Sequence, residues 1–356
     1  SFDQPLSHGG ASTARLLSWN RTLFWSSALD AVLPLGQTGS VLLAHHEETA
    51  CFNDKVITNT YSARVLPSML SSTEEGHYIP KDGYWWQHTA VSYFDGARSF
   101  FSLNRVERQA GQATVYKYDP YFLNVVEITD PLGNVTRGEI DYNNVEPFRL
   151  IDPNDNVSEV LYDALGVTVV TSYQGTVLGD GGAVHKYGNG LIKDYTRRND
   201  ETFDNILNNP GQFLQEAATF SFYDCDAWLR EGKPLTTIQL TRENLIHNGK
   251  GGTDHSTRLQ VELGYQDGFG RIIQSKRKVE DGPAIHRQPD GNVVLDASGV
   301  PELAHTSNRW LVTGHIVYNN KVQPVRQFEP FYSSAFAFES DAVLARYGVA
   351  TQNYYD

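Results

Sequence analysis

The chain has 356 residues, of which 40% are hydrophobic, 12% aromatic and 20% charged. This composition supports a folded protein and excludes a disordered one. The formal net charge is −13, and a net negative chain repels phosphate backbones, so no nucleic-acid partner is expected. The 2 cysteines cannot build a disulfide framework. No apolar run approaches the ~20 residues that cross a bilayer, so direct membrane insertion is not expected.

Residues 1–110 show no clear repeat, and we expect them to form a lead-in segment to the repetitive part of the chain. His45-His46-Glu47-Glu48 offers metal-binding side chains. Neighbouring histidines on a strand point to opposite sides, however, and no HExxH spacing brings two onto one face. Trp85-Trp86 offers a platform for a sugar, although most such aromatics pack across strands in a β protein. We therefore predict packed or solvated histidines, with no metal ligand, and a structural role for the tryptophans.

A hairpin pattern repeats along residues 111–356. Two Asp-Pro turns begin at Asp130 and Asp152, 22 residues apart, and Tyr142 precedes Tyr162 by 20 residues. A period of about 20 residues fits two strands of about 6 residues and two turns. In such turns Asp caps the turn backbone, Pro presets φ, and Gly or Asn accepts a positive φ. The pattern therefore predicts a predominantly all-β chain of antiparallel hairpins with a few short helices.

Later copies of the pattern are looser. The clearest runs from Tyr265 to Arg271, and others begin at Tyr223 and Tyr318. The final Tyr354-Tyr355-Asp356 resembles the opening of another copy, from which we expect an array that is truncated in the middle.

The non-repetitive stretches predict helices and loops. Short helices are expected at Phe203–Leu207 and at Asp341–Tyr347, the second capped by Ser340 and closed by Gly348. Loops rich in Gly, Asp and Asn are expected over 179–190, 247–256 and 280–297.

The residues of the repeat motif are predicted to be structural, with no catalytic residue among them. Each Tyr ring is expected to cover the neighbouring strand while its hydroxyl reaches a turn, and each Asp is expected to cap the turn that follows. The motif residues are Tyr118, Asp119, Asp130, Gly133, Tyr142, Asp152, Tyr162, Asp163, Tyr265, Asp267, Gly270 and Arg271.

Three further motifs resemble parts of known binding or catalytic sites. Asp152-Pro153-Asn154-Asp155-Asn156 matches the start of a calcium loop, but Val157 and Asp163 stand where Gly and Glu are required. Gly249-Lys250-Gly251-Gly252-Thr253 lacks the order of a phosphate loop. No GxSxG nucleophile elbow occurs. We therefore predict no metal, no cofactor and no enzymatic activity.

The Tyr-Asp motifs, together with Gly270-Arg271, resemble the RHS or YD-repeat family. Several longer stretches are similar to one branch of it, the B component of insecticidal Tc toxin complexes. These stretches are Val32-Leu33-Pro34-Leu35-Gly36, His45-His46-Glu47, Asp82-Gly83-Tyr84-Trp85-Trp86, Pro210-Gly211-Gln212-Phe213-Leu214 and Asn308-Arg309-Trp310-Leu311-Val312-Thr313-Gly314.

The resemblance implies that the chain is part of a hollow, spiralling β-shell of a secreted toxin complex. Such a shell encloses a toxic polypeptide together with a C-type RHS subunit, while other parts of the parent chain dock onto an A-type pore-forming subunit. The family's self-cleaving signature begins like Asp130-Pro131-Leu132-Gly133, but Asn134 replaces the expected Leu, so autoproteolysis is not implied.

Two other functions stay open on the sequence. An extracellular carbohydrate-binding or adhesion module built on the same repeats would need exposed aromatics such as Trp85 and Trp86. An acid/base glycosidase would need two carboxylates facing one cleft, about 5–10 Å apart.

Overall fold

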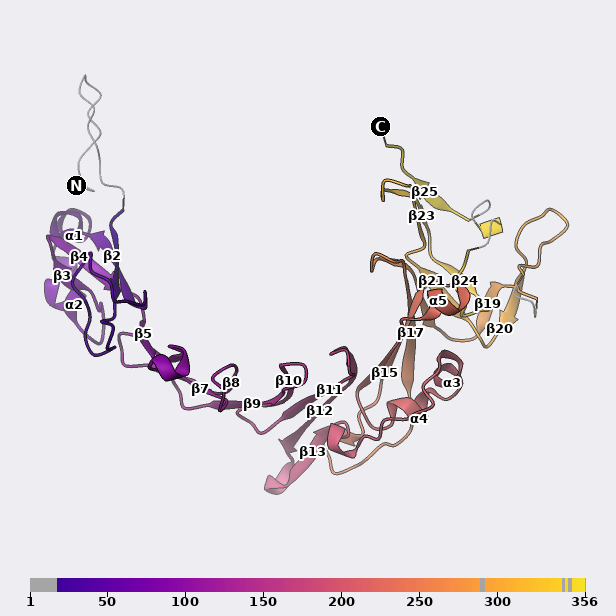
Figure 1. Ribbon diagram of the computed structural model, residues 1–356, viewed down its shortest axis with the longest axis horizontal. Coiled ribbons are helices and arrows are strands. Elements are labelled where there is room, and N and C mark those ends of the chain that lie inside the picture. Colours follow the sequence, from indigo (N-terminus) through magenta and orange to yellow (C-terminus); the bar gives the residue numbers. More distant parts are fainter. Residues whose placement is uncertain (1–17, 289–291, 341–342, 345–347, 356) are drawn as a thin grey trace, which may run out of the picture. The chain divides into compact units, whose positions relative to one another are not determined.

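A computed structural model describes residues 18–288, 292–340, 343–344 and 348–355. The chain divides into two compact units, Ser1–Ile140 with Ile151–Pro153 (unit 1) and Asp141–Leu150 with Asn154–Asp356 (unit 2). Both consist mainly of antiparallel strands with a few short helices, which confirms the predicted all-β class (Figure 1). In the described part of the chain, no helix has the length and apolar character needed to cross a membrane.

Unit 1 begins with a four-stranded sheet in the order β1-β2-β4-β3. Its strands are β1 (Asn20–Phe24), β2 (Ala44–Phe52), β3 (Ile79–Lys81) and β4 (Tyr84–His88). Two helices that the sequence did not predict lie between β2 and β3 in the chain, α1 (Asp54–Tyr61) and α2 (Pro67–Ser71). The side chain of Asn53 caps α1 by accepting a 3.0 Å hydrogen bond from the amide of Val56.

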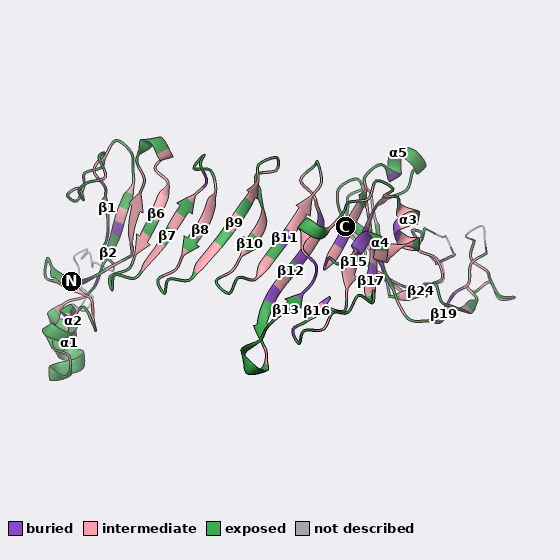
Figure 2. Ribbon diagram, turned by 90° about the horizontal axis from the view of Figure 1, so that it is seen from below, coloured by how far each residue is buried: buried purple, intermediate pink, exposed green. Residues whose placement is uncertain are grey.

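The rest of unit 1 is an antiparallel meander in which each strand pairs with the next. Its strands are β5 (Val91–Phe94), β6 (Leu103–Glu107), β7 (Ala113–Tyr118), β8 (Val125–Thr129) and β9 (Val135–Asp141). All residues of these five strands are described, and none is buried (Figure 2). The meander is therefore a single layer, stabilised by its ladders, cross-strand pairs and turns instead of a covering core.

The main sheet of unit 2 pairs strands in the order β11-β12-β14-β15-β17-β18-β21-β24, antiparallel throughout. These strands are β11 (Val157–Tyr162), β12 (Thr168–Leu178), β14 (Thr219–Asp224), β15 (Leu235–Arg242), β17 (Leu259–Gln266), β18 (Ile272–Lys278), β21 (Trp310–Thr313) and β24 (Phe331–Ser333).

Smaller strands of unit 2 attach to this sheet or stand apart. The attached strands are β10 (Glu146–Ile151), β13 (Val184–Gly188), β16 (His247–Asn248), β19 (Gly282–Ile285) and β20 (Leu303–Thr306). A separate three-stranded sheet contains β22 (Ile316–Tyr318), β23 (Pro324–Phe328) and β25 (Ala350–Gln352). Strands β13, β16 and β19 lie in the three stretches that we predicted to be loops, so those three predictions were wrong in part.

One face of the main sheet in unit 2 carries the core. Alternate residues of its central strands point into it, for example Ile238 and Leu240 of β15, and Val261 and Leu263 of β17. Helices α3 (Phe203–Asn208) and α4 (Pro210–Leu214) contribute Ile206, Phe213 and Leu214 to the same cluster, and α5 (Ala227–Glu231) follows β14. Helix α3 confirms the prediction for Phe203–Leu207. Of the helix predicted over 341–347, residues 341, 342 and 345–347 lie outside the described residues, as does Asp356.

Candidate functional site

Four Asp residues of the repeat motif, Asp119, Asp130, Asp163 and Asp267, cap a turn in the same way. The carboxylate of Asp130 accepts hydrogen bonds from the amides of Leu132 (2.8 Å) and Asn134 (2.9 Å). The first residue of the turn thus caps amides two and four residues further on. The same two-and-four pattern occurs at Asp119, Asp163, Asp267, Asp296, Asn248 and Asn319.

Sequence reasoning missed Asp296 and Asn248 as members of this set. The signal that would have found them is a Gly three residues after Asp or Asn, because that position adopts a left-handed backbone. Gly133, Gly270 and Gly299 have φ of 85°, 76° and 77° there. At Asp152, which begins the turn between β10 and β11, the corresponding residue is Asp155 with φ of 60°.

The tyrosines of the motif tie neighbouring hairpins together. The Tyr118 hydroxyl donates to the carbonyl of Leu103 (3.1 Å), and the Tyr162 hydroxyl donates to the carbonyl of Pro147 (3.0 Å), each acceptor lying 15 residues upstream. Tyr142 differs from these two in being 48% exposed. The motif residues are therefore spread one set to a hairpin, and the structure does not gather them into one site.

The later copy at Tyr265 is connected differently. Tyr265 is buried, and its hydroxyl donates to the carbonyl of Phe336 in the segment that covers the core. The carboxylate of Asp267 accepts a hydrogen bond from the guanidinium of Arg271, and Cζ of Arg271 lies 4.4 Å from the ring centre of Tyr318. This copy fastens the main sheet to the following part of unit 2.

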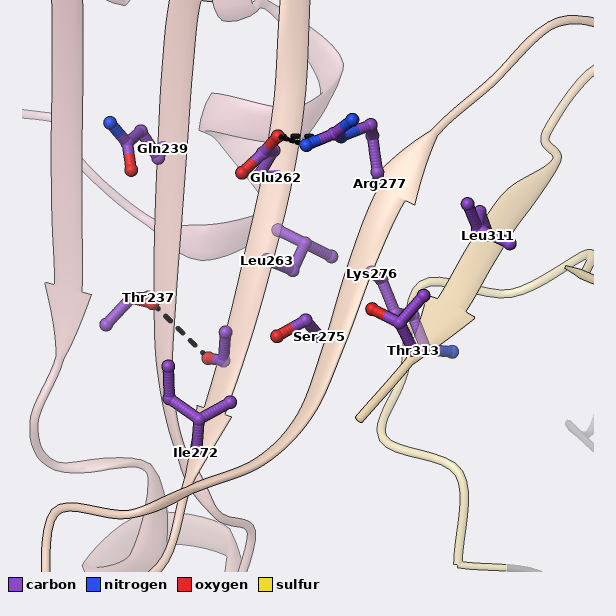
Figure 3. Close-up of a pocket in the computed structure, with 11 residues that line it drawn as sticks. Thr237, Gln239, Glu262, Leu263, Ile272, Ser275, Lys276, Arg277, Leu311 and Thr313 are labelled. Carbon is purple, nitrogen blue, oxygen red and sulfur yellow. Dashed lines mark hydrogen bonds and ion pairs between the residues drawn. The ribbon is translucent and has the colours of Figure 1, made fainter. Parts of the chain in front are cut away.

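The other face of the main sheet in unit 2 is open and polar. It holds a hollow of about 330 Å³ over β15, β17, β18 and β21 (Figure 3). Gly264 creates part of this space, since a Cβ there would lie 2.7 Å from Oγ1 of Thr237. Glu262 is the carboxylate among the described lining residues, and it pairs with Arg277 at 2.6 Å. A hollow with this lining lacks the two facing carboxylates that glycoside hydrolysis requires.

The covered face is fastened by a buried ion cluster around Lys276. Its side chain leaves the hollow for the opposite side of the sheet (Figure 3), where Nζ donates to the carbonyls of Ala335 (2.8 Å) and Ala337 (2.5 Å). The same Nζ lies 2.8 Å from Oε1 of Glu339, which also pairs with Arg287. Lys276 and Glu339 are each 1% exposed, so the cluster clamps residues 333–339 onto the core.

A groove of about 760 Å³ lies beside α5 in unit 2. Aromatic and charged side chains share its wall, and Trp228 among them is 67% exposed. An ion pair of 2.7 Å between Arg230 and Asp224 borders it. Grooves of this kind accept apolar side chains of a ligand or polypeptide.

Unit 1 contains a buried polar cluster that the sequence pattern did not reveal. His46 and Glu48 are two residues apart on β2 and therefore share one face of the strand. The β2–β4 register places His88 directly opposite Glu48. Nε2 of His88 lies 3.1 Å, and Nε2 of His46 3.6 Å, from Oε1 of Glu48. Lys81 donates to both oxygens of Glu48, at 3.3 and 3.2 Å. His88 comes from a strand 40 residues away, so only the fold could show this cluster.

The pKa values in this cluster follow from burial and charge. Burial alone raises the pKa of Glu48, but the hydrogen bond and charge of Lys81 outweigh it and hold that pKa below its usual value. Burial lowers the pKa of His88, and His46 lowers it further. At neutral pH the cluster therefore contains an ionised carboxylate beside a neutral His88.

The two tryptophans are buried, as the structural role predicted for them requires, and they do not form the exposed sugar platform of the alternative. Trp85 is 5% and Trp86 0% exposed, and their indole nitrogens donate to Asp54 and to the carbonyl of Lys81, both at 2.7 Å. The guanidinium of Arg21 covers Trp86 at 4.0 Å from the ring centre. The carbohydrate-binding alternative loses the residues on which it rested.

Comparison with known proteins places the fold. No protein-family model matches the chain, and no curated protein matches it in sequence. Solved structures do match. "TcdB2-TccC3" is 23% identical with a TM-score of 0.71, covering 92% of this chain and 15% of that one. "TcdB2-TccC3-TEV" is 19% identical with a TM-score of 0.74, covering 96% and 18%. A Photorhabdus luminescens Tc holotoxin pore is 20% identical with a TM-score of 0.69, covering 92% and 17%.

The chain therefore has a β fold like that of the Tc toxin chains, over nearly all of its own length. It spans only 15% to 18% of the chains it was matched with in these three structures. The assignment to the RHS repeat family gains no match from the family models and stays a prediction.

Proposed function

We propose that this chain is a non-catalytic wall segment of a toxin-complex shell that encloses a toxic polypeptide together with a C-type partner subunit. The observation that carries the proposal is the fold match, with TM-scores of 0.71 and 0.74 over 92% and 96% of the chain to structures of a TcdB2-TccC3 complex. The name TcdB2-TccC3 gives two components of one assembly, and the match covers most of both units of this chain.

The construction of the chain suits a wall. The meander β5 to β9 is one layer thick, and the Asp-capped turn recurs in it at Asp119 and Asp130, so hairpins can be added in series to enlarge a surface. A continuous sheet also leaves few free edges, which would otherwise pair with other chains. The mechanism is then steric, since a closed wall keeps proteases and other proteins in solution away from the enclosed polypeptide.

The remaining roles rest on the same assembly. The C-type subunit would continue the wall and carry the cargo, and an A-type pore-forming subunit would contact other parts of the parent chain. The complex would act outside the producing cell, which requires its secretion.

Limited proteolysis of the full parent chain, co-expressed with its C-type partner, tests the proposal. Deleting residues 119–140 removes β8 and all of β9 except Asp141, so the strands on either side keep their antiparallel alternation. The deletion should open the wall and make the partner's C-terminal region cleavable. Leu132→Ser is the matched control, because Leu132 is 87% exposed in the deleted hairpin and its replacement should leave protection intact. Equal protection in the deletion variant and the parent would disprove enclosure by this chain.

A further inference from the structure

The buried cluster of His46, Glu48 and His88 in unit 1 is not needed for a wall, and its chemistry differs from that of the surrounding sheet. One ligand atom from each of the three residues lies within 4.8 Å of the others. Two imidazoles and one carboxylate are the donor set that Zn²⁺ accepts with an open fourth position. We propose that these three side chains bind a divalent transition-metal ion, Zn²⁺ by preference.

Two of the three ligand-atom separations in the cluster match those around such an ion, and the third, between the two imidazole nitrogens, is within 4.8 Å. Ligand atoms about 2.1 Å from a tetrahedral zinc ion lie about 3.4 Å apart. The two imidazole nitrogens are 3.1 and 3.6 Å from Oε1 of Glu48, on either side of that value. The backbone fixes this spacing, because His46 and Glu48 are two residues apart on one strand and His88 is the cross-strand partner of Glu48.

An unpartnered nitrogen points to a ligand at the same place. Nε2 of His46 is buried and has no hydrogen-bond partner among the described residues, and the whole side chain is 8% exposed. Nδ1 of His46 lies 2.5 Å from Nδ1 of His45, so one of these two nitrogens carries a shared proton. When His46 Nδ1 carries it, Nε2 presents a lone pair toward the Glu48 carboxylate. Two acceptors that face each other across 3.6 Å are stabilised by a cation between them.

Two positively charged side chains, Arg21 and Lys81, already lie near Glu48 and would compete with a metal ion for its carboxylate. Arg21 is committed elsewhere, since it pairs with Asp82 at 2.6 Å, stacks on Trp86 and comes only within 3.8 Å of Glu48. Lys81 bonds Glu48 directly, but its side chain is 42% exposed and can turn into solvent. Metal binding should therefore displace Lys81, and removing its charge should strengthen the site.

The test is calorimetric titration of Zn²⁺ into the chelator-treated full chain, with Cys51→Ser and Cys225→Ser as background so that the two exposed thiols do not compete. We expect one ion per chain. His88→Gln and His46→Gln should each weaken binding by about tenfold to a hundredfold or more, and Lys81→Met should strengthen it by about tenfold. His255→Gln is the matched control, because His255 forms a similar His–Glu pair with Glu216 but is exposed, so its loss should change nothing.

A second readout separates binding from folding. Co²⁺ in place of Zn²⁺ should give visible absorption bands of a tetrahedral site in the parent and lose them in His88→Gln. His88 is only partly buried, so His88→Gln should leave the fold intact. Its circular dichroism spectrum in the presence of chelator should therefore match that of the parent. Failure to bind one Zn²⁺, or equal affinity in the parent and His88→Gln, would overturn the proposal. Neither result bears on cargo enclosure.

Discussion

Val322 occupies the strained position of a turn that most other copies give to glycine. Its φ is 66°, and the side chain of Asn319 caps the turn through the amides of Lys321 and Gln323, both at 2.9 Å. A left-handed backbone costs a residue with a Cβ about 1–2 kcal/mol, and a β-branched residue is the least suited to it. Val322→Gly should therefore raise the free energy of unfolding by about 1 kcal/mol, after the extra chain entropy of glycine is subtracted.

The control for this effect is the opposite substitution in an equivalent turn. A Cβ at Gly133 would meet no atom within 4 Å, so Gly133→Ala changes only the backbone preference at φ of 85°. It should lower the free energy of unfolding by about 1 kcal/mol. Urea denaturation of both variants measures the pair, and shifts of the same sign would contradict the backbone explanation.

Asp119 makes one turn sensitive to acid. It is 2% exposed, and its carboxylate accepts from the amides of Tyr121, Leu123 and Asn124 and from the side chain of Asn124. Burial alone raises its pKa, but these hydrogen bonds outweigh burial and hold the pKa below the ordinary Asp value. A depressed folded-state pKa means that the stabilisation is full above the unfolded pKa and is lost as the pH falls through the folded one.

Asp119→Asn should therefore destabilise the chain by about 1–3 kcal/mol at pH 7, because an amide NH₂ replaces an acceptor that faces two donors. The difference from the parent should shrink as the pH falls below the ordinary Asp pKa. Thermal unfolding of both proteins over an acid series checks this, and a difference that stays constant with pH would exclude the carboxylate's charge as its cause.

Among the elements, β18 shows how a sheet carries charge on its core side. Lys276 is buried, while its neighbour Lys278 on the same strand is exposed. Removing one member of a buried ion cluster leaves the others without compensation and costs about 3–5 kcal/mol. Lys276→Met should destabilise unit 2 by about this amount, and Lys278→Met should have little effect.

Hydrogen exchange of residues 333–339 gives the local readout for this prediction. Lys276 bonds two carbonyls of this segment, so the segment should lose protection in Lys276→Met even where the rest of unit 2 keeps it. If the segment stays protected, the aromatic contacts of Phe336 and Phe338 with the core hold it without the lysine.

Local patterns predicted some elements well and others poorly. The turns at Asp130 and Asp152 and the helix at Phe203 depend on residues close in sequence, and the structure contains all three. Strand β13 was expected to be loop because Gly179 to Gly190 is rich in turn residues, yet residues 184–188 pair with the extended end of β12. Pairing partners distant in sequence decide such a segment. The same holds for the His46–Glu48–His88 cluster, whose third member depends on the register of β2 with β4.

At the scale of the whole molecule, the two units differ in how much apolar surface they bury. Among the described residues, the core of unit 2 unites 13 buried side chains, whereas the cluster of unit 1 unites Ile57, Leu70 and Trp85. The meander β5 to β9 adds none. Burial of apolar surface is the main stabilising contribution, at about 25 cal/mol per Å². Unit 2 should therefore open only at higher free energy than unit 1.

Hydrogen exchange at increasing urea tests this order directly. Peptides from β7 and β8 should exchange first, those from β2 and β4 next, and those from β15 and β17 last, since strand protection follows the local density of buried contacts. Both β2 and β15 are long strands with a neighbour on each side, although only Glu48 and Thr49 of β2 are paired on both sides. One common urea midpoint for all of these peptides would mean that the chain unfolds as a single cooperative unit. Three separate midpoints would mean that the meander, the sheet of β1 to β4 and the main sheet of unit 2 unfold independently.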